Sequence, residues 1–414
     1  MALLMYAACD GGGLNTLAGA GGIVEIDLSN GRKTRYFEFP DGIGGSMHMV
    51  LPTPDKRALI ASSANIGQLF VLPRQGDRYD FAAFRCINTF NTLGPPTLGT
   101  DAQTAMFDFL DNEHVVCQYN RKLLQVHIDT GAMEVLVDIA AHYPHRADIL
   151  HQISVSGRWV VVDEVVKGGL FVWDRETREL TFLGDGFSGG HHVIYQNALG
   201  HTVVLRPAFG FQSEDAHLKI EDNAMSFYNL DTGEVATRCY SWEIENHHPT
   251  DMHVEDGYLY ASFAVPGSVA KIEVASGKIL ARFTARPWIG TRYLSMVLDG
   301  VTYAIDYGTM RNRYDTAKFT VPLFAHALFL GRAAGTRAGF FAMGFRPQDD
   351  VLYICHRGLN RLYCLSKTDL SKRWSMPLPS RKTYSRSRVK GFFYNHYPYF
   401  NRCLGVHHGT LVET

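Results

Sequence analysis

The chain alternates short apolar runs with polar turns along most of its length. Runs of roughly four to eight residues rich in Val, Ile, Leu, Tyr and Phe recur, and long windows with a helical apolar period are hard to find. Turns such as Asp129-Thr130-Gly131, Arg175-Glu176-Thr177-Arg178 and Asp231-Thr232-Gly233 separate the runs. Glycine supplies the positive φ angle that a tight hairpin turn needs. The pattern therefore predicts a chain built from β-hairpins.

The hairpins group into segments that repeat every 40–55 residues or so, which is the period of propeller blades. The segments lie near residues 1–40, 45–90, 100–140, 148–186, 188–242, 247–287, 290–335 and 338–379. We predict an all-β fold consisting of a single β-propeller domain over residues 1–414. Eight blades are preferred, and seven are possible because segment 290–335 is poorly patterned. The first segment lacks an innermost strand, so a strand within 388–414 is expected to close the ring by pairing the N- and C-terminal strands.

Five histidines fall at nearly the same place in these segments. The first four come shortly before a polar turn that opens an apolar run, and the fifth lies in the less regular copy GFFYNHYPYFNRCLGV; the five are His48, His151, His192, His248 and His396. The innermost strand of each blade lines the central channel of a propeller, so these side chains are expected to converge on one axis. Convergent imidazoles predict a site for a divalent transition metal, and they suit Fe, Mn, Zn and Cu alike.

Two features of this pattern leave alternatives open. His191 and His247 precede His192 and His248, and neighbours on a strand face opposite sides, so either member of each pair could point to the axis. His253 is a further candidate if the register of its blade differs. The plain alternative is that these histidines only form hydrogen bonds with backbone at the mouth of the channel.

Other polar residues near the strand starts are candidates for catalysis. Asp163 and Glu164 interrupt the apolar strand WVVVDEVV, and one of them is expected to approach the channel or the next blade. Tyr195, Glu164 and Arg292 are the predicted catalytic residues, as acid, base or anion clamp. Asp251 is expected to orient an imidazole by accepting a hydrogen bond from it.

The segments GGLFVWDRETRELTFLG and GSVAKIEVASGKILARF resemble the YVTN and quinoprotein-like propeller repeats. In the placement of its histidines the chain is also similar to metal-dependent propeller enzymes, namely carotenoid-cleaving oxygenases, oligogalacturonate lyases and virginiamycin B lyase. The first resemblance implies the fold. The second implies a histidine-ligated metal at the axis and a reaction on a small molecule.

The composition narrows the class of partner. With 40 basic and 41 acidic residues the net charge is −1, which favours neither nucleic acid nor a membrane surface as a partner. Seven cysteines without a CxxC pair are typical of free thiols in a reducing compartment, and no basic region precedes the apolar N-terminus, so we expect a cytoplasmic protein. The oligomeric state does not follow from the sequence.

These observations lead to a functional hypothesis with two rivals. The first choice is a metal-dependent enzyme, a lyase or cyclase, that acts on a small-molecule substrate in the central channel. A metal-dependent oxidoreductase or oxygenase is the alternative within the enzyme class. A non-catalytic propeller that serves as a protein-interaction scaffold is the alternative outside it, and it predicts no bound metal.

Overall fold

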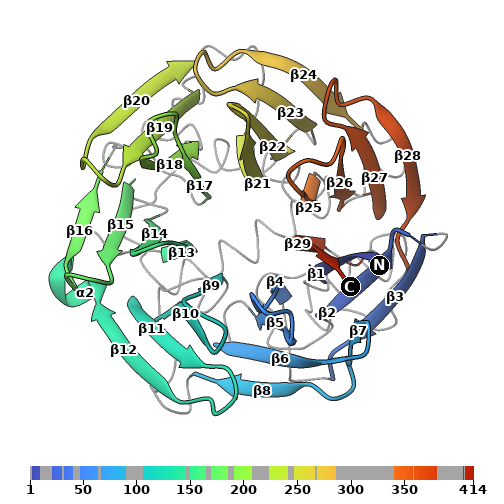
Figure 1. The fold of residues 1–414 in the computed structure, drawn as a ribbon, viewed down its shortest axis with the longest axis horizontal. Helices are drawn as coiled ribbons and strands as arrows, with labels where there is room; N and C mark the ends of the chain where they lie inside the picture. The colour runs from blue at the N-terminus through green and yellow to red at the C-terminus, as the bar shows by residue number, and fades with distance from the viewer. Residues whose placement is uncertain are drawn as a thin grey trace, which may run out of the picture.

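The computed structural model describes most of the chain. The described residues are 2–9, 21–29, 32–40, 47–63, 67–89, 106–145, 150–164, 169–184, 191–207, 223–240, 247–265, 268–285, 340–357, 359–379, 404 and 406–414. Seven antiparallel sheets stand around a central axis like the blades of a propeller, so the predicted fold class is confirmed (Figure 1).

Each blade is described here from its innermost strand outward. Blade 1 consists of β29 (Val406–Glu413), β1 (Leu3–Cys9), β2 (Gly22–Asp27) and β3 (Lys33–Glu38). Blade 2 consists of β4 (Met47–Pro52), β5 (Ala58–Ser63), β6 (Gln68–Gln75), β7 (Arg78–Tyr79) and β8 (Arg85–Asn88), the last two both pairing with β6. Blade 3 consists of β9 (Phe107–Phe109), β10 (His114–Tyr119), β11 (Lys122–His127) and β12 (Met133–Asp138). Blade 4 consists of β13 (Leu150–Ser156), β14 (Trp159–Glu164), β15 (Gly169–Asp174) and β16 (Leu180–Leu183).

The remaining three blades follow the same order. Blade 5 consists of β17 (Val193–Gln196), β18 (Thr202–Pro207), β19 (Asn223–Asn229) and β20 (Val235–Tyr240). Blade 6 consists of β21 (His247–Glu255), β22 (Tyr258–Val265), β23 (Ser268–Glu273) and β24 (Ile279–Thr284). Blade 7 consists of β25 (Phe340–Gly344), β26 (Val351–His356), β27 (Arg361–Ser366) and β28 (Lys372–Pro377). One helical turn, α2 (Ile139–His142), follows blade 3, and no described helix has the length and apolar character needed to cross a membrane.

The hairpin turns form where the sequence places them. Gly131 and Gly233 have φ angles of 75° and 73°, which is the left-handed region that the Asp-Thr-Gly turns require. In the turn without glycine, Arg178 adopts a φ of 61°, and the backbone N–H of Glu176 donates to the Asp174 side chain at 2.9 Å. Side-chain capping of this kind stabilises a turn that lacks glycine.

The core lies between the blades. Each of seven apolar clusters joins two neighbouring blades, from the cluster between blades 1 and 2 round to the one between blades 7 and 1. Tyr260 and Val269 of blade 6 pack directly with Phe340 and Leu352 of blade 7. The ring therefore closes with seven blades, the alternative that the sequence allowed, instead of the preferred eight. Segment 290–335, expected to form the additional blade, lies outside the described residues.

The two ends of the chain complete blade 1 together. Strand β29 pairs with β1 in antiparallel register, with Tyr6 opposite Thr410 and Ala7 opposite Gly409 (Figure 1). The predicted closure by an N-terminal and a C-terminal strand is thus confirmed. Since every blade then packs on two neighbours, the ring has no open side at which two blades could separate.

The ladder between β2 and β3 leaves no room for a side chain at Gly22. A Cβ atom at this position would lie 2.2 Å from the backbone oxygen of Phe37 and 2.8 Å from the Tyr36 ring. We expect Gly22→Ala to destabilise the protein by about 1–3 kcal/mol, because the ladder must shift to accept the methyl group. Thermal unfolding of the purified variant measures this, and an unchanged melting temperature would contradict it.

Candidate metal centre

Four histidines form a closed loop of neighbouring rings between the inner strands of blades 1, 2, 4 and 5. They are His48 on β4, His151 on β13, His191 just before β17, and His408 on β29. In that order around the loop, successive ring centres are 5.3, 5.0, 5.6 and 5.4 Å apart, the last value joining His408 back to His48. Residues far apart in the sequence thus present imidazoles to a common space.

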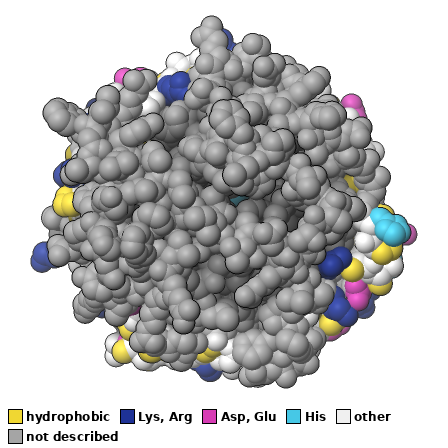
Figure 2. Space-filling view, turned by 180° about the vertical axis from the view of Figure 1, so that it is seen from behind, with side chains coloured by type: hydrophobic (Ala, Val, Ile, Leu, Met, Phe, Trp, Pro, Cys, Tyr) yellow, Lys and Arg dark blue, Asp and Glu magenta, His cyan; other side chains and the backbone are white. Residues whose placement is uncertain are grey.

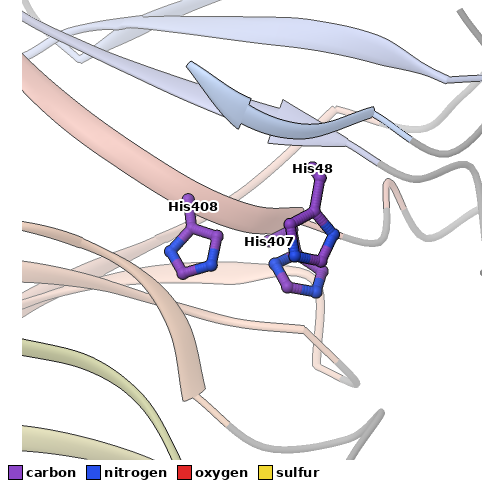
Figure 3. Close-up of side chains that lie close together, drawn as sticks. All are labelled: His48, His407 and His408. Carbon is purple, nitrogen blue, oxygen red and sulfur yellow. The ribbon is translucent and has the colours of Figure 1, made fainter. Parts of the chain in front are cut away.

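A fifth histidine, His407, lies against this loop. Its ring lies over that of His48, with ring centres 3.6 Å apart (Figure 3). The ring centre of Phe341 lies 5.3 Å from that of His407. One nitrogen from each of His48, His407 and His408 lies within 4.8 Å of the other two. Burial, together with the nearby histidines and Arg357, holds the pKa of His407 well below its usual range. A neutral imidazole keeps a lone pair for a ligand.

Irregularities in the inner strands place these side chains. The register between β4 and β5 shifts between Met47 and Met49, so His48 is the extra residue of a bulge. The same kind of shift sets His151 and Gln152 opposite Asp163 of β14. Bulges commonly redirect a side chain away from the alternation of its strand.

The closing strand and the inner strand of blade 6 are interrupted in the same way. The register of β29 against β1 shifts between Val406 and Gly409, which sets His407 and His408 in the irregular stretch. The register of β21 against β22 shifts between Pro249 and Met252, around Asp251. Residues at these four bulges therefore include most of the axial cluster and its acidic neighbour.

Asp251 fixes the orientation of His408. The Nδ1 atom of His408 lies 2.5 Å from Asp251 Oδ1, and the backbone N–H of Met343 donates to the other carboxylate oxygen at 2.8 Å. A neutral imidazole that donates from Nδ1 to a carboxylate has its lone pair on Nε2. Nε2 has no hydrogen-bond partner within the described part of the chain. A carboxylate behind an imidazole is the usual support of a metal-ligating histidine.

His192 belongs to a separate, fully buried network between blades 4 and 5. Its Nδ1 contacts Asp163, and Arg206 Nε donates to the other oxygen of Asp163 at 2.5 Å. Burial alone would raise the pKa of Asp163, but the charges of His192 and Arg206 and their hydrogen bonds outweigh it and hold the pKa below its usual value. The ring contacts of the loop involve His191 and not its neighbour. His191 therefore takes the axial place that the sequence left open between the two.

The other predicted residues are placed as follows. Glu164 is buried at the end of β14, where its backbone oxygen accepts a hydrogen bond from Arg206 at 2.8 Å. Tyr195 on β17 packs at the edge of the apolar cluster between blades 5 and 6. The side chain of His248, and all of His396 and Arg292, lie outside the described residues.

His253 and Asp251 complete the comparison with the sequence. His253 stacks on Phe345 with ring centres 4.6 Å apart, and burial lowers its pKa to about 4. It thus lies between blades 6 and 7. Asp251 does contact an imidazole, as expected, and that imidazole is His408 of the closing strand.

His407 and His408 were missed by the sequence analysis. The closing strand lies within the expected range 388–414, but the histidine expected from this range was His396, whereas β29 begins at Val406. A signal was present, because VHHGTLVE repeats the His-His pair that occurs at 191–192 and 247–248.

On the face opposite to that of Figure 1, a small area of histidine colour is visible near the centre of the ring (Figure 2).

Comparison with known proteins shows similarity of fold alone. No family model and no curated protein matches the sequence. Among solved structures, apo AztD from Citrobacter koseri has a TM-score of 0.52 at 9% identity and covers 99% of this chain and 98% of its own. A functionally unknown protein from Desulfotomaculum acetoxidans has a TM-score of 0.51 at 9% identity, covering 89% and 94%. A hypothetical selenium-binding protein from Sulfolobus tokodaii has a TM-score of 0.50 at 11% identity, covering 68% and 74%. What this chain shares with them is the propeller fold.

Proposed function

We propose that the axial histidines bind one transition metal ion and that the protein is a metal-dependent enzyme for a small molecule. The proposed ligands are the four loop histidines, His48, His151, His191 and His408, with His407 as a neutral neighbour. The spacing of the loop supports this proposal most strongly. Nitrogens about 2.0–2.1 Å from a tetrahedral ion put the centres of neighbouring imidazoles about 5 Å apart. Four of the six pairs that four ligands make, those between neighbouring rings of the loop, have separations of 5.0–5.6 Å, close to that value.

The donor set narrows the metal without identifying it. Neutral imidazoles suit Zn, Cu and Fe, whereas Mg and Ca prefer oxygen ligands. His407 stacks too closely on His48 for both rings to share a tetrahedral ion without a rotation, since their centres are only 3.6 Å apart. Asp251 keeps Nε2 of His408 available, as its contact with Nδ1 selects the tautomer.

Such an ion would supply a Lewis acid that polarises an oxygen atom of a small molecule in the channel. This is the role that a lyase or cyclase reaction requires, and that class is our first choice. A metal-dependent oxidoreductase would use the same ligands. The hypothetical selenium-binding protein from Sulfolobus tokodaii shares the fold at 11% identity, and its name does not bear on the choice between these reactions.

Metal content tests the proposal directly. Protein incubated with Zn, Cu, Fe or Mn and then desalted should retain about one ion per chain of at least one of them. The double variant His48→Gln/His408→Gln should lose it, because two adjacent members of the loop are removed. Inductively coupled plasma mass spectrometry gives the stoichiometry.

The control is His114→Gln, which changes a histidine on β10 that pairs with Asp111 at 2.9 Å and is partly exposed. It should retain the wild-type metal content. Folded wild-type protein that stays metal-free with all four ions would overturn the proposal and favour the protein-interaction scaffold.

A further inference from the structure

A continuous set of hydrogen bonds joins blades 4 and 5 immediately beside two of the proposed ligands. Gln152 follows His151 in the same bulge, and His192 follows His191. The Gln152 side chain donates to the backbone oxygen of His192 at 2.9 Å and accepts from its backbone N–H at 2.7 Å. This reciprocal pair ties the two ligand-bearing backbones together.

The His192 side chain extends the connection into the blades. Its Nδ1 contacts Asp163, the residue of β14 that lies opposite the bulge. Arg206 of β18 donates to Asp163 at 2.5 Å and to the Glu164 backbone at 2.8 Å, which returns the connection from blade 5 to blade 4. All three side chains, His192, Asp163 and Arg206, are completely buried.

The network buries charged groups, which is energetically unfavourable, although apolar contacts could also hold two blades together. Seven apolar clusters already join the blades, including the one between blades 4 and 5 that contains Val161 and Val204. A buried ion pair adds little net stability over apolar packing, so stability alone does not account for it. The network does provide directional hydrogen bonds between blades 4 and 5, next to His151 and His191.

We infer that Gln152, His192, Asp163 and Arg206 form a positioning network that holds His151 and His191 at their separation of 5.0 Å for joint binding of the metal ion. His192 is accordingly a positioning residue and His191 the ligand. This inference rests on the proposed function, because it assigns a supporting role within the same metal site.

The test measures the affinity and the ligand field of the metal separately. Gln152→Ala and Asp163→Asn should each weaken Zn binding about 10–100-fold, the usual cost of losing support behind a ligand. Cobalt(II) bound to the variants should show visible absorption bands of changed position and intensity, because His151 and His191 no longer ligate as in the wild type. Circular dichroism and the melting temperature show whether each variant is folded. Because Gln152→Ala removes no buried charge, it still tests the inference if Asp163→Asn folds poorly.

Asp27→Asn is the matched control. Asp27 is also buried and also pairs with an arginine, Arg78, at 2.8 Å, but in the contact between blades 1 and 2. It should leave the Zn affinity and the cobalt spectrum unchanged. Folded Gln152→Ala and Asp163→Asn proteins with wild-type affinity and spectrum would overturn the positioning role while leaving the metal site intact. A wild type that binds neither Zn nor Co would instead refute the proposed function, and the positioning role with it.

Discussion

Replacing Arg206 with leucine is expected to destabilise the protein by about 3–5 kcal/mol, because the change takes the guanidinium from the buried carboxylate of Asp163, one of its two partners beside His192. Arg206 is among the largest fully buried side chains, and its guanidinium bonds both Asp163 and the Glu164 backbone. Leucine fills much of the space but offers no donor to either oxygen. Chemical or thermal unfolding of the purified variant measures the loss.

Two further variants distinguish the effect of the buried Asp163 charge from the effect of losing any arginine. Arg57→Leu removes an arginine that pairs with Asp129 at 2.8 Å on the surface, with 39% of its side chain exposed. It should cost about 1 kcal/mol or less. Adding Asp163→Asn to Arg206→Leu should recover part of the lost stability, because it removes the carboxylate charge that the guanidinium no longer balances. Equal effects at Arg206 and Arg57 would argue against a strongly destabilised buried carboxylate.

Saturating metal is expected to stabilise the folded protein by about 4 kcal/mol at a free concentration 1,000 times the dissociation constant. The reason is that the proposed ligands lie on blades 1, 2, 4 and 5 and come together only in the closed ring. An ion that binds the folded chain and not the unfolded one shifts the equilibrium by its binding free energy. Melting temperature against metal concentration gives the dependence.

The stabilisation should vanish in His48→Gln/His408→Gln and should be reversed in the wild type by a chelator. His114→Gln should behave as the wild type does. A rise in melting temperature of the same size in the double variant would mean that the ion binds elsewhere on the chain. The stabilisation would then be no evidence for a metal site at the axial histidines.

The sequence predicted the blades well because blade structure depends on local chemistry. Apolar runs, Asp-Thr-Gly turns and their spacing decide where each hairpin lies. Apart from β29, which lies in the C-terminal tail, the strands of the seven observed sheets fall within seven of the eight expected segments. The number of blades does not follow from local sequence, because it depends on which blades pack against each other. Tertiary contacts, such as those of Thr250 with Phe340 and of His253 with Phe345, show that blades 6 and 7 are adjacent.

The site was harder to predict for a similar reason. His48 and His151 could be found because each stands near the start of an inner strand whose apolar run and following turn are clear in the sequence. The choice of His191 over His192 depends on the contact of His192 with Asp163, which is a tertiary interaction. In a regular strand, side chains alternate between the two faces of the sheet. The bulges break this alternation, so strand periodicity could not show which histidines face the axis.

The closing strand has a consequence for the stage of synthesis at which the proposed metal ion could bind. β29 is translated after every other strand of the ring, and it carries His407 and His408 as well as the edge that pairs with β1. A nascent chain that still lacks β29 has neither a closed ring nor a complete set of proposed ligands. Loading of the proposed ion with its full set of ligands is therefore expected to follow the pairing of β29 with β1.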